Sequence, residues 1–366
     1  MTGSSVKKMK IKEINLTRFR PLSVFAGLTL AFIPALHSAR ASTQYTFETI
    51  NNNGDPHFNQ LLGINNNSTI AGYFGDGVIQ PNKGFTVVPP YTQASFTNEN
   101  FPGSFQTQVV GINNASNPTT VGFWADTTND NFGWVKQGNS FIQVVDPNTP
   151  APAVGTTQVN QLLGVNDQNI AAGFYNDAAG NSHGYLYNVQ KGTFTSVVPN
   201  SFTALSLAVT DINNLGMISG FYTDPQGHGH GFIANLNTNT FTSLDDPNGT
   251  NTMLLGLNNK GEVVGSFVNG AGVTNGLVYN ISTNTWQTVN DPNQSSTPAF
   301  NVTGTTINGV NDLGQLVGFY SDGTNVDGFL ATAVPEPSPL ATVFVSAVAG
   351  LLIVGFRTRR STRNAS

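Results

Sequence analysis

The stretch Asp211-Ile212-Asn213-Asn214-Leu215-Gly216-Met217-Ile218-Ser219-Gly220-Phe221 decides the fold of this chain, because its pattern occurs six times. Each copy has an apolar residue, an Asn, a second Asn or Asp, a turn, and an apolar run that ends near a Gly. The period is 45 to 53 residues, as the positions of the first Asn show: Asn65, Asn113, Asn166, Asn213, Asn258 and Asn311. A period of this length is typical of repeat architectures.

Each repeat contains four short runs that are rich in Val, Ile, Thr, Phe and Tyr. The turn after the Asn pair suits a tight hairpin, because Asn and Gly tolerate a positive φ. The second run ends in Gly and an aromatic residue in five copies, and in Gly265-Ser266-Phe267 in the fifth. A third run starts near a Gly, and a fourth follows, as in Phe241-Thr242-Ser243-Leu244. Alternating runs of this length predict antiparallel strands.

Four strands per repeat predict an all-β fold, a β-propeller of six four-stranded blades over residues 42–333. The sixth repeat stops after its third run, Gly328-Phe329-Leu330-Ala331, whereas residues 45–50 resemble a fourth run that belongs to no repeat. Pairing of residues 45–50 with residues 326–332 would close the ring and leave no exposed sheet edge. The first two repeats are less regular, so five or seven blades remain as alternatives.

The N-terminal end predicts a signal peptide over residues 1–41. Lysines and arginines up to Arg20 precede an apolar run from Pro21 to Leu36, and small residues follow. This order predicts cleavage between Ala41 and Ser42. The basic region is long, which leaves an uncleaved membrane anchor as the alternative.

The C-terminal residues 334–366 fall into three parts. Pro335, Glu336 and Pro337 come first, and residues 340–356 then form a run of 17 uncharged, mostly apolar residues. That length is at the short limit for a transmembrane helix. A basic stop follows the helix, and its charges would remain in the cytoplasm; it contains Arg357, Arg359, Arg360 and Arg363. Both ends therefore predict a body outside the cytoplasm.

This order of Pro335-Glu336-Pro337, apolar run and arginines resembles the PEP-CTERM sorting signal. The resemblance implies that an exosortase-type membrane enzyme recognises the tail and processes the chain near Pro-Glu-Pro. It also implies a protein of the cell envelope or surface that is membrane-anchored at first and can be released to an exopolysaccharide or biofilm matrix. The alternative is an ordinary single-span anchor behind a Pro-rich linker.

The third runs of two repeats, His183-Gly184-Tyr185 and His230-Gly231-Phe232, resemble bacterial extracellular repeats named for a His-Ala-Phe signature. Two of the six copies carry the His, and all six carry Gly in place of Ala. The resemblance implies an extracellular location and a repeat architecture, and it implies no particular activity.

The charged residues are divided sharply between the ends and the body. All seven arginines lie before residue 42 or after residue 356, and residues 42–334 hold four lysines and 18 acidic residues, a formal charge of −14. Such a body repels polyanions, because affinity for nucleic acid depends on Lys and Arg that displace counterions. Nucleic acid is therefore excluded as a partner. The absence of Cys excludes disulfides and thiolate chemistry.

Two sets of side chains are candidate metal ligands. Among the body histidines His57, His183, His228 and His230, only the last two stand close together, and no third ligand accompanies them at a fixed spacing. We therefore predict no histidine metal site. A recurrent loop residue offers oxygen ligands that suit calcium, but turn capping selects the same residue types, so calcium is a minor alternative to a protein without cofactors. These loop residues are Asp76, Asp126, Asp177, Asp224, Asn269 and Asp322.

Enzymatic signatures are missing from the body. It has no Arg, no nucleophile elbow, no phosphate loop and no zinc signature. A glycosidase needs two carboxyl groups that converge, and the unrepeated acids from which such a pair could come are Asp130, Asp146, Asp245, Asp246 and Glu262.

Aromatic residues are the candidates for sugar contact, since a flat ring can cover a sugar face. We expect Trp124, Trp134 and Trp286 to be the better candidates. The aromatics that follow the second-run Gly are predicted to lie in the core; they include Phe123, Phe174, Phe221 and Phe319.

The leading hypothesis is a non-enzymatic cell-surface or matrix-associated repeat protein, with polysaccharide as the expected partner in exopolysaccharide or biofilm adhesion. The alternative is an extracellular polysaccharide-acting enzyme, a glycosidase or lyase on a propeller scaffold.

Overall fold

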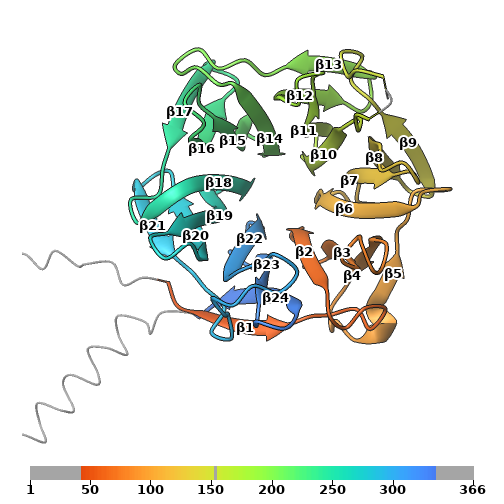
Figure 1. The fold of residues 1–366 in the computed structure, drawn as a ribbon, viewed down its shortest axis with the longest axis vertical. Helices are drawn as coiled ribbons and strands as arrows, with labels where there is room; N and C mark the ends of the chain where they lie inside the picture. The colour runs from red at the N-terminus through yellow and green to blue at the C-terminus, as the bar shows by residue number, and fades with distance from the viewer. Residues whose placement is uncertain (1–42, 152–154, 335–366) are drawn as a thin grey trace, which may run out of the picture. The chain divides into compact units, whose positions relative to one another are not determined.

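The computed structural model describes residues 43–151 and 155–334. In this part of the chain, six antiparallel sheets of four strands each are arranged in a ring around a central axis (Figure 1). The prediction of a six-bladed β-propeller is therefore confirmed. The alternatives of five and seven blades are wrong, because the two less regular repeats each form a complete blade.

The first three blades follow one another along the chain. The first consists of β2 (Asn59–Ile64), β3 (Ile70–Phe74), β4 (Lys83–Val87) and β5 (Phe96–Asn98), with a 3-10 helix η1 (Gln93–Ser95) before β5. The second consists of β6 (Gln106–Ile112), β7 (Thr120–Ala125), β8 (Asn131–Gln137) and β9 (Ser140–Val144). The third consists of β10 (Asn160–Val165), β11 (Ile170–Asn176), β12 (Ser182–Asn188) and β13 (Thr193–Ser196).

The last three blades complete the ring. The fourth consists of β14 (Ser206–Ile212), β15 (Met217–Thr223), β16 (Gly229–Asn235) and β17 (Thr240–Leu244). The fifth consists of β18 (Gly249–Leu257), β19 (Glu262–Asn269), β20 (Thr274–Asn280) and β21 (Thr285–Thr288). The sixth takes strands from both ends of the body: β22 (Thr305–Val310), β23 (Leu316–Ser321), β24 (Val326–Ala333) and β1 (Tyr45–Thr49).

Strand β1 closes the ring, as the sequence predicts. It pairs with β24 in antiparallel register from Tyr45 opposite Ala333 to Thr49 opposite Phe329, and Figure 1 shows the two strands side by side. The pairing extends by one hydrogen bond at each end: the N–H of Val334 donates to the carbonyl of Gln44 at 2.8 Å, and that of Ile50 donates to Gly328 at 2.9 Å. The outer edge of β24 is thereby covered.

The hydrophobic core lies within and between the blades, and the third strand of each blade supplies its central side chain. This position follows a Gly in every repeat and is fully buried; it is occupied by Phe85, Trp134, Tyr185, Phe232, Leu277 and Phe329. Large buried rings supply much of the apolar area that leaves water on folding.

The glycine near the end of each second strand has a steric cause. The first strand of every blade carries a β-bulge, and a backbone carbonyl beside the bulge lies directly over this glycine. A Cβ atom there would stand 1.8 to 2.3 Å from that oxygen, which no side chain can accommodate. The six positions are Gly72, Gly122, Gly173, Gly220, Gly265 and Gly318.

The predictions for the two ends lie outside the described residues. They concern the signal peptide with its cleavage site at Ala41 and Ser42, the Pro335–Pro337 motif, the transmembrane helix at 340–356 and the arginines behind it. Within residues 43–151 and 155–334, no helix is long and apolar enough to cross a membrane.

Candidate functional site

The repeated first Asn forms a closed belt of hydrogen bonds around the axis. The side-chain Nδ2 of each donates to the backbone carbonyl of the equivalent Asn in the next blade, at 3.0 to 3.2 Å. The last bond runs from Asn311 back to Asn65. In each blade, the Oδ1 of the same side chain accepts N–H groups of its own turn, as Asn213 does from Leu215 and Met217. One side chain thus shapes the turn and joins two blades.

The second residue of the motif forms a parallel belt. Its backbone N–H donates to the side-chain Oδ1 of the equivalent residue in the next blade, at 2.6 to 2.9 Å, through all six blades. This position is Asp in the third and sixth blades, where Asp167 and Asp312 each accept hydrogen bonds from Asn side chains on both sides. The Asn-Asn and Asn-Asp pairs therefore have a structural role in fastening the ring.

A cavity of about 520 Å³ occupies the centre of the ring. The first strands form its walls with apolar side chains such as Leu62, Val110 and Leu163. Near the starts of these strands, Gln60, Gln108 and Gln161 add amide groups. The Asn belts lie at the other ends of the same strands, beside a smaller pocket of about 60 Å³. Ligand pockets in proteins span about 300 to 1,000 Å³, so the larger cavity has the size of a binding site.

Asp211 breaks the symmetry of the cavity wall. The other five repeats have Gly at this position, where adjacent first strands come into close contact, and Asp211 lines both the cavity and the smaller pocket. Its Oδ1 accepts the N–H of Ile212 at 2.8 Å, and its Oδ2 accepts that of Leu257 at 3.0 Å. Burial raises the pKa of Asp211 to about 7, against the lowering effect of these two hydrogen bonds. The signal was present in the sequence, as an Asp where the aligned repeats have Gly, but its consequence depends on the ring.

We expect the stability of Asp211→Asn relative to the wild type to rise with pH. The unfolded Asp ionises near pH 4 and the folded one near pH 7, so ionisation of Asp211 costs no stability below pH 4 and destabilises the wild type progressively as the pH rises from 4 to 7. The Asn side chain does not ionise, so its stability relative to the wild type should rise by up to about 4 kcal/mol between pH 4 and 7, at about 1.4 kcal/mol for each of three pKa units. Because the Asn Nδ2 cannot accept the N–H of Leu257, the variant also loses one hydrogen bond, and this loss does not vary with pH. Urea unfolding of both proteins at pH 4 to 8 measures it.

The control is Asp76→Asn. Burial raises the pKa of Asp76 slightly, but hydrogen bonds from the backbone of Gln80, Val78 and Ile79 outweigh it and lower the pKa overall. The stability of Asp76→Asn relative to the wild type should therefore not rise with pH. A difference for Asp211→Asn that stays constant from pH 4 to 8 would show that the Asp211 carboxyl titrates normally.

Three of the aromatic residues predicted to lie in the core line the cavity, and one of them, Phe319, also packs against a buried hydrophobic cluster. Phe123 on β7, Phe221 on β15 and Phe319 on β23 are half-buried and belong to the second, fourth and sixth blades. Phe174 on β11, at the equivalent position in the third blade, is half-buried but does not line the cavity. The prediction was wrong for Phe123 and Phe221 because the third-strand residue covers the second-strand Gly, as Trp134 covers Gly122, and the next residue along the strand points to the opposite face of the sheet.

Two of the three tryptophans offer no free face to a sugar, and the third, Trp286, is half-buried with Tyr279 against its ring. Trp134 is fully buried in the core of the second blade. Trp124 is stacked between Phe101 and Phe132, at centroid distances of 5.0 and 4.6 Å. Trp286 packs against Tyr279 at 4.4 Å in the fifth blade. The surroundings of Trp124 and Trp134 therefore argue against the sequence-based preference for these two residues as sugar contacts, and none of the three lines the central cavity.

The recurrent loop acids act as turn caps. In each loop, Oδ1 accepts backbone N–H groups from residues two and three or four positions ahead, as Asp177 does from Ala179 and Asn181. The same pattern occurs in the other five loops, with Asn269 in the fifth. Backbone capping thus accounts for the recurrence of these residues without a calcium ion.

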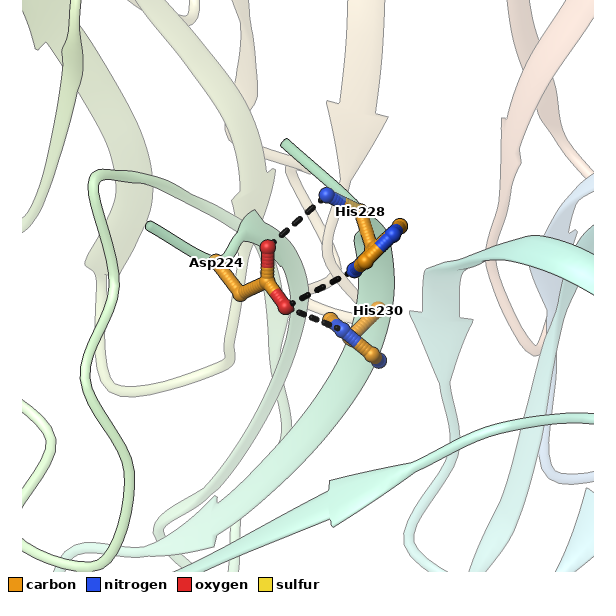
Figure 2. A group of neighbouring side chains, drawn as sticks. All are labelled: Asp224, His228 and His230. Atoms are coloured by element: carbon orange, nitrogen blue, oxygen red, sulfur yellow. Dashed lines mark hydrogen bonds and ion pairs between the residues drawn. The ribbon is translucent and has the colours of Figure 1, made fainter. Parts of the chain in front are cut away.

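In the fourth blade, one of these loops brings three potential metal ligands together. Asp224 follows β15, and His228 and His230 lie at the start of β16; one ligand atom from each lies within 4.8 Å of the others (Figure 2). The Asp224 Oδ2 is 3.2 Å from the Nδ1 of His228 and 3.5 Å from the Nε2 of His230. The sequence pattern shows no third ligand near the two histidines, which argued against a metal site. In the folded chain Asp224 supplies this third ligand group.

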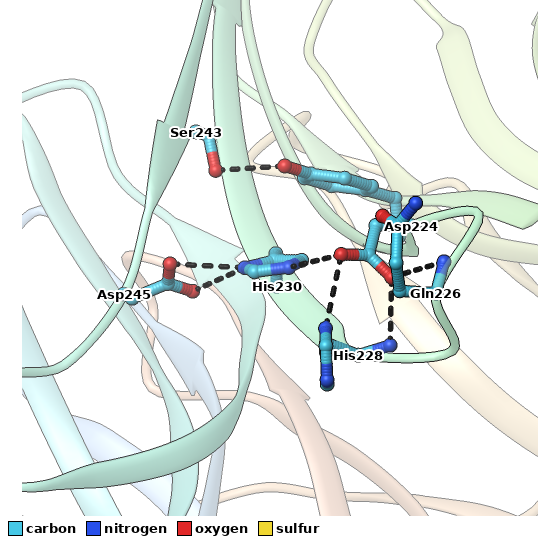
Figure 3. A network of polar contacts seen from close by, with 7 residues as sticks. Asp224, Gln226, His228, His230, Ser243 and Asp245 are labelled. Atoms are coloured by element: carbon cyan, nitrogen blue, oxygen red, sulfur yellow. Dashed lines mark hydrogen bonds and ion pairs between the residues drawn. The ribbon is translucent and has the colours of Figure 1, made fainter. Parts of the chain in front are cut away.

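A second carboxylate completes this network. Asp245, just after β17, contacts the Nδ1 of His230 with its two oxygens at 2.9 and 3.1 Å, as Figure 3 shows. Burial lowers the pKa of His230, but the hydrogen bonds and charges of Asp245 and Asp224 outweigh it and raise the pKa overall. The backbone N–H of His228, followed by the two histidine rings, holds the pKa of Asp224 at about 2. All four residues are candidates from the sequence, but their spacing along the chain does not predict that they lie together.

The other acids from which a catalytic pair could come have local partners. Asp130 accepts the N–H of Gln158, Asp146 and Asp246 cap the Asp-Pro-Asn turns that follow β9 and β17, and Glu262 accepts a hydrogen bond from Asn258. They lie in the second, fourth and fifth blades, away from a common pocket.

The sequence matches no protein-family model and no curated protein. Among solved structures, it is similar to the SapL1 lectin in complex with α-methyl fucoside, with 10% identity and a TM-score of 0.49 over 76% of this chain and 97% of that one. The fungal Aleuria aurantia lectin, a six-bladed β-propeller, gives 10% identity and a TM-score of 0.47 over 81% and 97%. TolB from Acinetobacter baumannii gives 9% and 0.44 over 75% and 54%. Likeness at this level carries no argument about a ligand.

Proposed function

We propose that this chain is an exported, non-enzymatic surface or matrix protein whose propeller binds polysaccharide at the central cavity. The observation that carries the proposal is the juxtaposition of phenyl rings and amide groups there: Phe123, Phe221 and Phe319 line the same cavity as Gln60, Gln108 and Gln161. Sugar rings present apolar C–H faces and hydroxyl edges. Aromatic rings cover the faces, and amides can donate to and accept from the hydroxyls.

The amide groups are held in position by their neighbours. The Nε2 of Gln108 donates to Asn82 at 2.9 Å, and that of Gln161 donates to Asn131 at 3.0 Å. In both residues the bond uses the amide nitrogen, so the carbonyl end can accept from a ligand hydroxyl. Polar groups fixed in this way lose little conformational freedom on binding, which favours affinity.

The charge of the body favours a neutral polysaccharide or one with amino groups. Residues 42–334 have a formal charge of −14, and Asp211 is the one ionisable residue among those that line the cavity in the described part of the chain. A polyanionic chain would be repelled on approach.

The set of residues that line the cavity favours binding over catalysis. Glycoside hydrolysis ordinarily uses two carboxyl groups on opposite sides of the bond that is cleaved, and Asp211 has no second carboxyl group beside it among the cavity-lining residues described. The alternative function, an extracellular glycosidase or lyase, is supported only by the raised pKa of Asp211, which is a feature shared by general acids.

Export and anchoring belong to the proposal through the sequence. Cleavage between Ala41 and Ser42 would release the body outside the cytoplasm, and the PEP-CTERM-like tail with Pro335-Glu336-Pro337 would hold it in the membrane until an exosortase-type enzyme processes it. A location at the cell surface or in the matrix is where a polysaccharide ligand is abundant.

A glycan-binding and turnover screen on the purified body, residues 43–334, tests the function. We expect binding of a neutral or amino-sugar glycan without turnover. Phe221→Ala should weaken it about tenfold, which corresponds to ~1.4 kcal/mol for one lost ring contact. Phe174→Ala is the matched control, because Phe174 has the same position in its blade but lies outside the cavity lining, and it should bind as the wild type does.

Turnover of any glycan would replace the binding role by the enzymatic alternative. If Phe221→Ala and Phe174→Ala lose the same amount of binding affinity, the binding site is not at the cavity.

A further inference from the structure

We propose that Asp224, His228 and His230 bind a divalent transition-metal ion of the zinc type in the fourth blade, at the loop between β15 and β16 (Figure 2). The inference is independent of the polysaccharide proposal. It depends on the geometry of this loop, in which two imidazole nitrogens and one carboxylate oxygen converge.

The distances between the ligand atoms fit a tetrahedral metal. Zinc bonds of about 2.0 to 2.1 Å put two ligand atoms of a tetrahedron roughly 3.3 to 3.4 Å apart. The Asp224 Oδ2 stands 3.2 Å from His228 Nδ1 and 3.5 Å from His230 Nε2, close to that edge length. The distance between the two histidine nitrogens is at most 4.8 Å. The His228 side chain is 72% exposed and can rotate to shorten it.

The Asp224 carboxylate is oriented by the loop that it caps. Its Oδ1 accepts the backbone N–H groups of Gln226 at 2.9 Å and His228 at 2.8 Å, and Figure 3 shows both bonds. These bonds fix the plane of the carboxylate and leave Oδ2 directed at the two histidines. The oxygen that would bind the metal is therefore held in place by the backbone.

The His230 ring is oriented by a carboxylate on its other side. With its Nδ1–H donating to Asp245, the Nε2 atom that faces Asp224 is the one with a free lone pair. Metal-binding histidines commonly have this carboxylate or carbonyl partner, which fixes the ring and increases its basicity. The ring also stacks on Tyr222 at a centroid distance of 5.0 Å, and the Tyr222 hydroxyl in turn contacts Ser243.

The third blade provides the same loop without the complete site. There Asp177 and His183 occupy the positions of Asp224 and His230, and their side chains are 2.9 Å apart. Asn181 stands at the position of His228, and the exposed Val198 stands at that of Asp245. The loop fold therefore needs neither of these two fourth-blade residues, and their coincidence in one blade points to a ligand.

The donor set favours zinc or a similar ion over calcium. Imidazole nitrogens suit Zn²⁺, Cu²⁺ and Ni²⁺, whereas Ca²⁺ takes six to eight oxygen ligands. Three protein ligands leave a fourth position that water or a ligand group can occupy.

The loop lies on the face of the ring where the first strands start, because an antiparallel second strand ends where the first begins. This is the same face as that of Gln60, Gln108 and Gln161.

The test is a calorimetric titration of the full chain with Zn²⁺. The chain is expressed without a histidine tag, purified in mild detergent and stripped of metal with a chelator. We expect one Zn²⁺ per chain. The variant His228→Asn, which restores the third-blade arrangement, should abolish this binding. Asp245→Val should weaken it about tenfold or more, the usual effect of removing a carboxylate behind a metal-bound histidine. His183→Asn in the third blade is the matched control and should bind as the wild type does.

Co²⁺ in place of Zn²⁺ gives a second readout, since a tetrahedral site with nitrogen and oxygen ligands gives visible absorption bands. Circular dichroism of each variant should be unchanged, because the substituted side chains are partly or fully exposed. The proposal is wrong if the wild type takes up no Zn²⁺ at micromolar concentrations. It is also wrong if His228→Asn binds normally, or if His183→Asn loses the ion equally.

Discussion

Removal of residues 43–50 is expected to abolish the cooperative unfolding transition of the propeller. These residues contain β1, which pairs with β24 over five residue pairs and covers its outer edge. Phe47 and Tyr45 also pack on the core of the sixth blade, with the Phe47 and Phe329 rings 5.5 Å apart. At about 1 kcal/mol net for each of some five hydrogen bonds, the loss is comparable to the whole stability of a domain, about 5 to 15 kcal/mol.

The control moves the strand instead of deleting it. Because the N–H of Val334 donates to the carbonyl of Gln44, an Asn-Gly turn can join residue 334 to residue 44 as a two-residue hairpin. A chain that begins at residue 51 and carries residues 44–50 after this turn should form the sixth blade from consecutive strands. We expect it to unfold cooperatively, with a midpoint near that of the wild type.

Thermal and urea unfolding of the three proteins, followed by circular dichroism, measures the effect. A deletion protein that unfolds with the wild-type midpoint would show that the ring does not need β1. If the deletion protein does not unfold cooperatively and the transplanted protein does, the stability comes from the pairing of this strand with β24 and not from the position of the N-terminus.

Gly265→Ala is expected to destabilise the protein by about 3 kcal/mol, because its Cβ would lie 1.8 Å from the backbone oxygen of Met253. That oxygen belongs to the bulged strand β18, which forms part of the cavity wall. Relief of the overlap requires a shift of the backbone, since no side chain can rotate away. For a folded body of this size the melting temperature should fall by roughly 5 °C.

Gly270→Ala is the matched control, five residues further along the same blade. No heavy atom lies within 4 Å of a Cβ built there, and its φ is not in the positive region that favours glycine. Its unfolding midpoint should stay within about 1 °C of the wild type. Equal effects at the two positions would mean that the loss comes from glycine flexibility and not from the Met253 carbonyl.

Much of the architecture could be predicted from the repeats. The six Asn-containing turns, the strands beside them and the unpaired run at residues 45–50 are local patterns, and they led to six blades and to closure by β1. Strand pairing within a blade joins neighbours in the sequence, so alternation and turn residues are sufficient to predict it.

The candidate sites were less predictable, because they depend on contacts between residues of different strands and blades. Phe123 and Phe221 were expected in the core, but they line the central cavity that the ring of blades encloses. His228 and His230 were judged to lack a third ligand, but the capped loop folds Asp224 back onto them. The backbone path that brings such groups within 3 to 4 Å is not a property of sequence spacing.

The Asn motif shows best which features follow from the sequence and which depend on the tertiary structure. The sequence by itself determined that an Asn-Asn or Asn-Asp pair recurs every 45 to 53 residues and begins a turn, since Asn and Asp favour that local conformation. Only the tertiary structure decided that the six pairs join in two closed belts, from Asn65 through Asn311 and back. A belt requires all six blades to be in place, so its hydrogen bonds are a property of the ring. Asp211 follows the same rule: the sequence supplies an Asp in a Gly position, and the close contact of adjacent blades raises its pKa.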